Sequence, residues 1–308
     1  MDKPHFKHIT LIGIGLIGSS IARDIRILGL ADKLVVSTRR DITLMRAKKL
    51  DLGTHYTLSM SEAVTDADLI IISVPVGAYE NIAKEIAPYL KADSIVTDVG
   101  STKVSVISQI QPHIPLGVHF IPGHPIAGTE ESGPDAGFSG LFRNRWCILT
   151  PIPNTNQHAL DRVQAFWQAL GSHVDHMDPF HHDQVLAIVS HLPHIIAYNM
   201  VTSAMDLETV VKSEVIKYSA SGFRDFTRLA ASDPIMWRDI CVHNKDAILV
   251  MLDLFIKNLT SLKRMISSQD GNKLFEFFSH TRNVRRSIVE IAQDVDKPDF
   301  GRHDFDKT

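Results

Sequence analysis

Apolar residues in the first half of the chain occur in short runs that alternate with helix-like repeats. Residues 8–12, 34–37 and 68–74 are apolar runs of strand length, and residues 21–28 repeat at helical spacing. Such alternation predicts a doubly wound parallel sheet, because crossover helices cover both faces of the sheet and make its strands apolar throughout. Further strands are predicted at 94–99, 118–121 and 146–149, and further helices at 77–90 and 102–111.

The pattern changes beyond the middle of the chain, where strand-like runs give way to long helical repeats. Apolar residues recur at helical spacing over 185–196, 248–259 and 274–292. We therefore predict an α/β domain over residues 1–177 and an all-helical domain over residues 178–308. A chain of 308 residues has the length of about two ordinary domains.

Composition narrows the classes of function. The chain has 32 Lys and Arg against 35 Asp and Glu, so it lacks the excess of basic residues that is typical of a nucleic-acid binder. No apolar run of the sequence approaches the roughly 18 residues of a membrane span. Two cysteines, Cys147 and Cys241, are too few for a disulfide framework and fit a reducing compartment. We expect a cytoplasmic protein that binds neither nucleic acid nor membrane.

A glycine pattern follows the first predicted strand and opens the first predicted helix. Gly13, Gly15 and Gly18 form G-x-G-x-x-G, in which the glycines allow a tight turn, close approach to a pyrophosphate, and close helix–strand packing. The helix N-terminus then offers free N–H groups to the phosphates. The sequence therefore predicts a Rossmann-type dinucleotide-binding domain, in which Leu16 and Ile17 also contact the cofactor.

The residues after the second strand bear on the choice of cofactor. The acidic residue that binds the ribose of NAD is expected about 20 residues after the glycines. Ser37, Thr38, Arg39 and Arg40 stand there instead. Hydroxyl and guanidinium groups bind a 2′-phosphate, which a carboxylate would repel, so the sequence favours NADP and leaves NAD as the alternative. Further cofactor contacts are predicted at Val74 and Pro75.

Four polar motifs are candidates for the chemistry of the site. The motifs DVGSTK (98–103) and GHPIAGTE (123–130) follow predicted strands, and ligands of such sheets bind beyond the carboxyl ends of the strands. Ser101 and His124 are therefore placed to meet a nicotinamide ring. The motifs SHLPH (190–194) and FRDFTR (223–228) lie in the helical domain, which must close the cleft.

Six motifs together resemble one enzyme family. The segments GIGLIGSS, DVGSTK, GHPIAGTE, SHLPH, FRDFTR and DPIMWRD, in this order, are similar to those of the prephenate dehydrogenase (arogenate or cyclohexadienyl dehydrogenase) family, over about residues 8–295. The resemblance implies oxidation of prephenate to 4-hydroxyphenylpyruvate and CO2, or of arogenate to tyrosine and CO2, in tyrosine biosynthesis. It also implies a homodimer that forms through the helical domain.

The resemblance assigns roles to individual residues. It implies that His124 is the base at the ring hydroxyl of the substrate, and a histidine suits this role because its pKa lies near neutrality. Ser101 is implied as the partner that orients His124. Arg228 is implied as the clamp of a substrate carboxylate, which a planar guanidinium can hold through two hydrogen bonds. His194 is ranked above His191 as the histidine of the substrate pocket.

Other residues near these motifs are weaker candidates for substrate binding. Thr129 and Glu130 follow the catalytic segment and are predicted to contact substrate or to gate the pocket. Ser221 and Gly222 precede FRDFTR and are expected near the substrate side chain, a keto acid in prephenate and an amino acid in arogenate. Trp237 is interpreted as lining the site, with core packing as the alternative.

Three other hypotheses compete with this interpretation. The histidines and aspartates at 173–183 suggest a metal site, but their spacing fits no metal-binding motif, so no metal is expected. Asp183 is interpreted instead as a helix-borne partner for an arginine or histidine of the site. A non-catalytic NADP-sensing protein would need no base or clamp. A β-hydroxy acid dehydrogenase would need a lysine motif that the helical half lacks. We also expect no appended chorismate mutase or regulatory domain.

Overall fold

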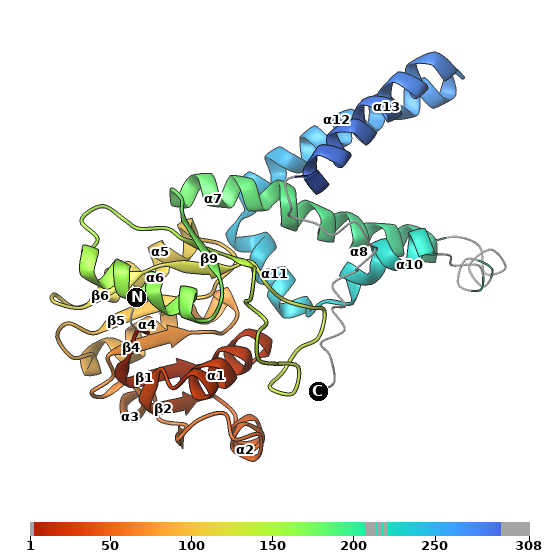
Figure 1. Cartoon of the computed structure of the whole chain (residues 1–308). Helices are drawn as coiled ribbons and strands as arrows, with labels where there is room; N and C mark the ends of the chain where they lie inside the picture. Colours follow the sequence, from red (N-terminus) through yellow and green to blue (C-terminus); the bar gives the residue numbers. More distant parts are fainter. Residues whose placement is uncertain (1–2, 207–213, 215–216, 218–220, 291–308) are drawn as a thin grey trace.

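The fold was determined as a computed structural model that describes residues 3–206, 214, 217 and 221–290. Its N-terminal part is a six-stranded parallel sheet with strand order β3-β2-β1-β4-β5-β6 (Figure 1). The strands are β1 (Phe6–Ile12), β2 (Ala31–Ser37), β3 (His55–Thr57), β4 (Leu69–Ile72), β5 (Ile95–Asp98) and β6 (His119–Ile121). The connecting helices are α1 (Leu16–Leu28), α2 (Asp41–Lys49), α3 (Met60–Val64), α4 (Tyr79–Ile86) and α5 (Val104–Ile110).

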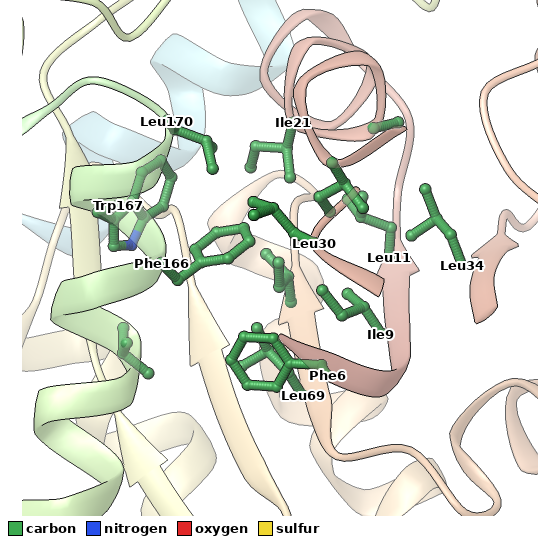
Figure 2. Packing of buried hydrophobic residues seen from close by; sticks show 14 of the residues in the cluster. Phe6, Ile9, Leu11, Ile21, Leu30, Leu34, Leu69, Phe166, Trp167 and Leu170 are labelled. Carbon is green, nitrogen blue, oxygen red and sulfur yellow. The ribbon is translucent and has the colours of Figure 1, made fainter. Parts of the chain in front are cut away.

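Helices cover both faces of this sheet, which explains its continuously apolar strands. All four residues of β4 are buried, and their side chains alternate between two hydrophobic clusters. One cluster lies between the sheet and the helices α1 and α6 (Gln157–Ala169), where Phe166 of α6 packs edge-on against Phe6, with Trp167 beside it (Figure 2). The predicted α/β fold with a doubly wound sheet followed by a helical domain is confirmed.

A second, smaller sheet was not predicted. Its strands are β7 (Gly123–Pro125), β8 (Trp146–Leu149) and β9 (His173–His176), with β7 antiparallel to β8 and β8 parallel to β9. The run at 146–149 was correctly predicted as a strand, but it does not extend the main sheet. The motif GHPIAGTE follows β6 as predicted, but its first three residues form β7, with which β8 pairs.

The predicted helix at 77–90 is broken into three parts. The observed segments are a 3-10 turn η1 (Val76–Ala78), helix α4, and a second 3-10 turn η2 (Ala87–Tyr89). Pro88 lies in η2, and a proline lacks the N–H that would continue the α-helical hydrogen-bond ladder. The short strand β3 was also missed, since three residues give no readable alternation.

The helical part begins with one continuous helix. It comprises α7 (Pro179–Leu186), a π-helical segment (Ala187–His191) and α8 (Leu192–Met205). Pro193 lies in the first turn of α8, directly after the π-helical segment. The remaining helices are α10 (Ser221–Thr227), the 3-10 turn η5 (Arg228–Ala231), α11 (Pro234–His243), α12 (Lys245–Ser267) and α13 (Gly271–Glu290).

Two of the helical elements expose much apolar surface. Helices α12 and α13 pair as a hairpin that extends away from the rest of the molecule (Figure 1).

By length and composition alone, the continuous helix Pro179–Met205 could cross a membrane, with a mean hydropathy of 1.4 over its most apolar window. Its buried His182, Asp183 and His191 bond to neighbouring elements instead, so this helix packs against the α/β part.

Candidate active site

The glycine loop has the geometry that each of its glycines was predicted to require. A Cβ on Gly13, whose φ is +94°, would lie 2.2 Å from the Ser73 carbonyl oxygen. A Cβ on Gly18 would lie 2.4 Å from the Gly13 carbonyl oxygen, so only glycine permits this packing of α1. No atom lies within 4 Å of a Cβ built on Gly15, which leaves space for a ligand at the N-terminus of α1. Val74 packs directly against Gly13.

The segment after β2 combines buried hydroxyls with exposed cations. Ser37 is fully buried and its Oγ faces the Met60 sulfur at 3.7 Å. The Thr38 hydroxyl donates to the Arg40 carbonyl oxygen at 3.0 Å, which shapes the turn. The side chains of Arg39 and Arg40 are exposed at the sheet edge. Of this segment, the two arginines are the groups most available to an anion outside the protein.

A fully buried ion pair supports the strand that carries His124. Lys103 donates from Nζ to the Asp98 carboxylate and, at 2.6 Å, to the Gly123 carbonyl oxygen. Asp98 also accepts from the backbone N–H groups of Gly100 and Gly123, at 2.7 and 3.1 Å. Because a buried charge is tolerated only with such partners, these bonds fix the end of β5 against β7. They thereby fix the position of His124.

His124 is 7% exposed and heads a chain of hydrogen-bonded side chains. Its Nδ1 lies 2.9 Å from Nε2 of His182, whose Nδ1 lies 2.8 Å from a carboxylate oxygen of Asp183. The same carboxylate accepts the backbone N–H groups of Lys103 and Val104 at 2.7 and 3.0 Å, at the start of α5. Burial, followed by the neighbouring His182, holds the pKa of His124 well below its ordinary value. The imidazole is therefore neutral at neutral pH.

The histidines of the SHLPH motif have different surroundings. His191 is buried, bonds through Nδ1 to Asn244 at 3.1 Å, and has its pKa lowered to about 4, chiefly by burial. His194 is half-buried and stacks on the Trp237 ring, with centroids 3.8 Å apart. Its Nδ1 donates to the Ser190 carbonyl oxygen at 2.9 Å, which leaves Nε2 for a ligand. The ranking of His194 above His191 as a ligand-facing residue agrees with these environments.

Arg228 forms the cationic side of the same region. Its guanidinium donates to Glu130 at 2.9 Å, and both side chains keep about 30% of their surface exposed. Arg228 also contributes to lowering the pKa of His194, after the larger effect of burial, so the two groups are close. The Nε of Arg228 and the Nε1 of Trp237 are buried donors with no hydrogen-bond partner among the residues that the structure describes. Both are able to hydrogen-bond an anionic ligand.

Family models match both parts of the chain. The nucleotide-binding domain of prephenate dehydrogenase matches residues 21–176, and the dimerization domain of prephenate dehydrogenase matches residues 178–280. The chain belongs to the prephenate dehydrogenase family. The family resemblance drawn from the six motifs is confirmed, and the chain is an oxidoreductase of tyrosine biosynthesis.

Individual relatives in this family cover nearly the whole chain. The cyclohexadienyl dehydrogenase of Zymomonas mobilis is 42% identical over 283 residues, which cover 92% of this chain and 96% of that protein. The prephenate dehydrogenase of Bacillus subtilis is 34% identical, over 91% of this chain and 76% of that protein. The crystal structure of A. aeolicus prephenate dehydrogenase with hydroxyphenyl propionate and NAD+ has a TM-score of 0.85 at 32% identity, covering 92% of this chain and 98% of that one.

Several residues predicted from the family motifs are not linked to His124 by a described contact. Ser101 follows β5 and is half-buried, but the hydrogen bond at Nδ1 of His124 comes from His182, so the orienting role of Ser101 stays a prediction. The Thr129 hydroxyl accepts from the Glu131 N–H at 3.3 Å. Gly222 is exposed near the start of α10, and the side chain of Ser221 lies outside the described residues.

Some of the polar residues that are buried at the site were not predicted from the sequence. His182 was weighed only as a metal ligand, and Asn244 was not considered. The adjacent His-His-Asp run was a usable signal, because a buried histidine and aspartate on one helix need polar partners. In the part of the chain that the structure describes, no three His, Cys, Asp or Glu side chains are grouped closely enough to hold a metal ion.

Proposed function

We propose that this chain oxidises prephenate to 4-hydroxyphenylpyruvate and CO2, with a nicotinamide dinucleotide held across the glycine loop. The observation that supports the proposal best is the buried, neutral His124, whose Nδ1 is engaged by His182 while Nε2 stays available. A neutral imidazole of this kind is suited to accept a proton. The A. aeolicus relative was crystallised with a hydroxyphenyl ligand and NAD+, which agrees with this chemistry.

In the proposed reaction, His124 removes the proton of the ring hydroxyl through Nε2. A nicotinamide held at the glycine loop would supply the oxidant, to which the ring carbon that bears this hydroxyl would lose a hydride. Loss of the ring carboxylate as CO2 then restores an aromatic ring, which makes the reaction effectively irreversible. Ser101 is proposed to orient the substrate hydroxyl and the imidazole. The buried surroundings of His124 exclude water and preserve its basic form.

The substrate carboxylates need cationic partners, and Arg228 is proposed as the main one. The guanidinium of Arg228 donates to the Glu130 carboxylate, so a substrate carboxylate would replace that of Glu130 as its partner. His194, stacked on Trp237, is proposed to bind the substrate side chain through Nε2. Thr129, Ser221 and Gly222 are proposed to border the same pocket.

NADP is proposed as the preferred form of the cofactor. The support is the absence of a carboxylate at position 37 and the two exposed cations, Arg39 and Arg40, beside it. NAD is the alternative, and it is the cofactor in the A. aeolicus crystal structure. Gly13, Gly15, Leu16, Ile17 and Gly18 are proposed to bind the pyrophosphate in either case, with Val74 and Pro75 alongside.

The chain is further proposed to act as a cytoplasmic homodimer, with nucleotide binding over 1–177 and substrate binding and dimerisation over 178–308. Helices α12 and α13 support the dimer, since Leu254, Phe275 and Phe278 are about half exposed or more. A monomer rarely exposes a contiguous apolar face of this kind. A second copy of the helical part would cover it.

A comparison of kcat/KM for prephenate and arogenate, each with NADP and NAD, tests the proposed function. We expect measurable turnover of prephenate, with NADP preferred, followed by the absorbance of the reduced cofactor. Preference for arogenate would replace the substrate assignment. Absence of turnover with both substrates, in a protein that still binds the dinucleotide, would support a non-catalytic sensor instead.

The His124→Asn variant tests the proposed base. We expect kcat to fall about 100-fold or more, as removal of a general base typically does, while the dissociation constant of NADP stays unchanged. Stopped-flow turnover and fluorescence titration of the cofactor measure the two quantities. A variant within threefold of the wild-type kcat would remove His124 from the mechanism.

A further inference from the structure

Three buried side chains, His124, His182 and Asp183, form an unbroken line of hydrogen bonds behind the proposed base. We propose that His182 and Asp183 are positioning residues that fix His124 in its Nδ1–H tautomer and stabilise the imidazolium ion that it becomes during turnover. The inference rests on the proposed function in which His124 is the base. The line joins β7 to α7, so it connects the α/β part to the helical part through the reacting group.

The direction of each hydrogen bond follows from the far end of the line. Asp183 accepts two backbone N–H groups, from Lys103 and Val104, and therefore acts as an ionised acceptor. His182 must then donate to it from Nδ1, which leaves Nε2 of the neutral ring without a proton. That nitrogen can only accept, so the bond from His124 requires a proton on its Nδ1. The lone pair of neutral His124 is consequently confined to Nε2.

This tautomer suits proton removal from a hydroxyl. As the substrate O–H bond breaks, a new N–H bond forms at Nε2 of His124, and the O–H electron pair becomes the second bond of a C=O group on the oxidised ring. When CO2 leaves, its bonding pair restores the aromatic ring, and the oxygen regains the proton from His124 as the phenol of the product. The hydride goes to the nicotinamide that the proposed function already includes, so no other oxidant is needed. The positive charge on His124 strengthens its Nδ1–H bond to His182, whose other nitrogen faces the Asp183 carboxylate.

Other charged or titratable groups around the line do not replace Asp183. Lys103 and Asp98 lie on the α5 side in the buried ion pair, and their effects on the pKa of His182 are opposite, since Lys103 lowers it and Asp98 raises it. His191 faces the line from the π-helical segment, and its pKa of about 4 keeps it neutral. Cys147 on β8 is buried, which raises the pKa of its thiol and keeps it uncharged. Asp183 is therefore the carboxylate whose charge reaches the imidazoles directly.

Two substitutions of His182 separate positioning from simple packing. His182→Gln keeps a hydrogen-bond acceptor near Nδ1 of His124, whereas His182→Phe fills the space without one. We expect kcat to fall about tenfold in His182→Gln and about 100-fold or more in His182→Phe, with the KM of prephenate little changed. His181→Phe, at the exposed neighbouring position, is the matched control and should retain wild-type kcat. Equal activity of the Gln and Phe variants would overturn the proposal.

The pH profile of kcat/KM provides a readout that a packing defect would not move. The Asp183 carboxylate favours the protonated imidazole, so its removal in Asp183→Asn lowers the pKa of the base. We expect the acid limb of the profile to shift to lower pH in Asp183→Asn and to stay in place in His181→Phe. A loss of rate in Asp183→Asn without a shift would assign Asp183 to packing alone.

A spectroscopic test does not depend on turnover. We expect ¹⁵N spectra of histidine-labelled protein to show His124 protonated at Nδ1 alone, and to show a mixture of tautomers in His182→Phe. Should this tautomer be observed without oxidation of prephenate, the proposed function fails and the hydrogen-bonded line stands. Turnover of prephenate with neutral His124 protonated at Nε2 would refute the line and the assignment of Nε2 as the basic atom, while the oxidation of prephenate itself would stand.

Discussion

Buried polar side chains at the site differ in the partners that they have. Burial holds the pKa of His124 and His191 below the ordinary value, because a desolvated imidazole loses less by staying neutral. Asp183 instead keeps its charge through two backbone N–H groups and His182. The difference lies in the partners available to each group, and it assigns the role of base to an imidazole.

Substitution of Arg228 tests its role as the carboxylate clamp. Lysine keeps the charge but cannot make two parallel hydrogen bonds to one carboxylate. We expect Arg228→Lys to raise the KM of prephenate about tenfold or more, with a smaller effect on kcat, in steady-state assays. A large fall in kcat at unchanged KM would instead indicate that Arg228 acts in the transition state.

The cofactor preference depends on two exposed residues. We expect the double substitution Arg39→Ala and Arg40→Ala to raise the KM of NADP about tenfold, because two cations near a 2′-phosphate are lost, and to leave the KM of NAD nearly unchanged. Steady-state assays with both cofactors measure the ratio. Equal changes for the two cofactors would show that the arginines do not read the phosphate.

At the scale of elements, helix α11 is fastened to the loop after β4. Asp239 is buried and accepts the Gly77 N–H at 3.1 Å, so α11 contacts η1 directly. The same helix carries Trp237, on which His194 stacks. The loop of the α/β part that is proposed to meet the cofactor is thereby linked to the proposed substrate pocket through one side chain.

Replacement of Gly77 tests this link. A Cβ there would lie 2.7 Å from Oδ2 of Asp239, so the two elements must separate. We expect Gly77→Ala to destabilise the protein by about 1–3 kcal/mol and to raise the KM of prephenate, because α11 moves with Trp237. Thermal unfolding and steady-state assays measure these effects. Gly271→Ala, with no atom within 4 Å of the added Cβ, is the control, and an equally mild effect at Gly77 would contradict the prediction.

At the scale of the whole molecule, buried neutral histidines make stability depend on pH. Burial, assisted by Lys33, lowers the pKa of His8 to about 4 in the folded protein. Between about pH 6.5 and pH 4 the unfolded chain therefore binds a proton that the folded chain does not, so stability falls as the pH falls through this range. One such histidine accounts for roughly 3 kcal/mol at the acid end.

The His8→Gln variant isolates this effect far from the site. We expect its free energy of unfolding to change less between about pH 7 and about pH 4 than that of the wild type. Urea unfolding at the two pH values measures both free energies. The variant need not be more stable at neutral pH, because it loses the 3.1 Å hydrogen bond between His8 and Thr10. An identical pH dependence in both proteins would assign the acid sensitivity elsewhere.

Local patterns were sufficient for the main sheet and the glycine loop. The strands β1, β4 and β5 were located because buried parallel strands are apolar throughout, and the loop because G-x-G-x-x-G directly follows the first of them. The family followed from six motifs with their order along the chain. Each of these features depends on residues close together in sequence, so the sequence by itself determined them.

The partners across the site were decided by the tertiary structure alone. His124 and His182 are 58 residues apart and Glu130 and Arg228 are 98 apart, and no spacing rule connects such pairs. Strand β7 has three residues, too few for a pattern, and it forms because β8 pairs with it. The environment of each imidazole, and hence its pKa, depends on what the packed elements bring around it. Motifs can be recognised along the sequence, whereas the burial of a side chain and its hydrogen-bond partners are set only when the elements pack together.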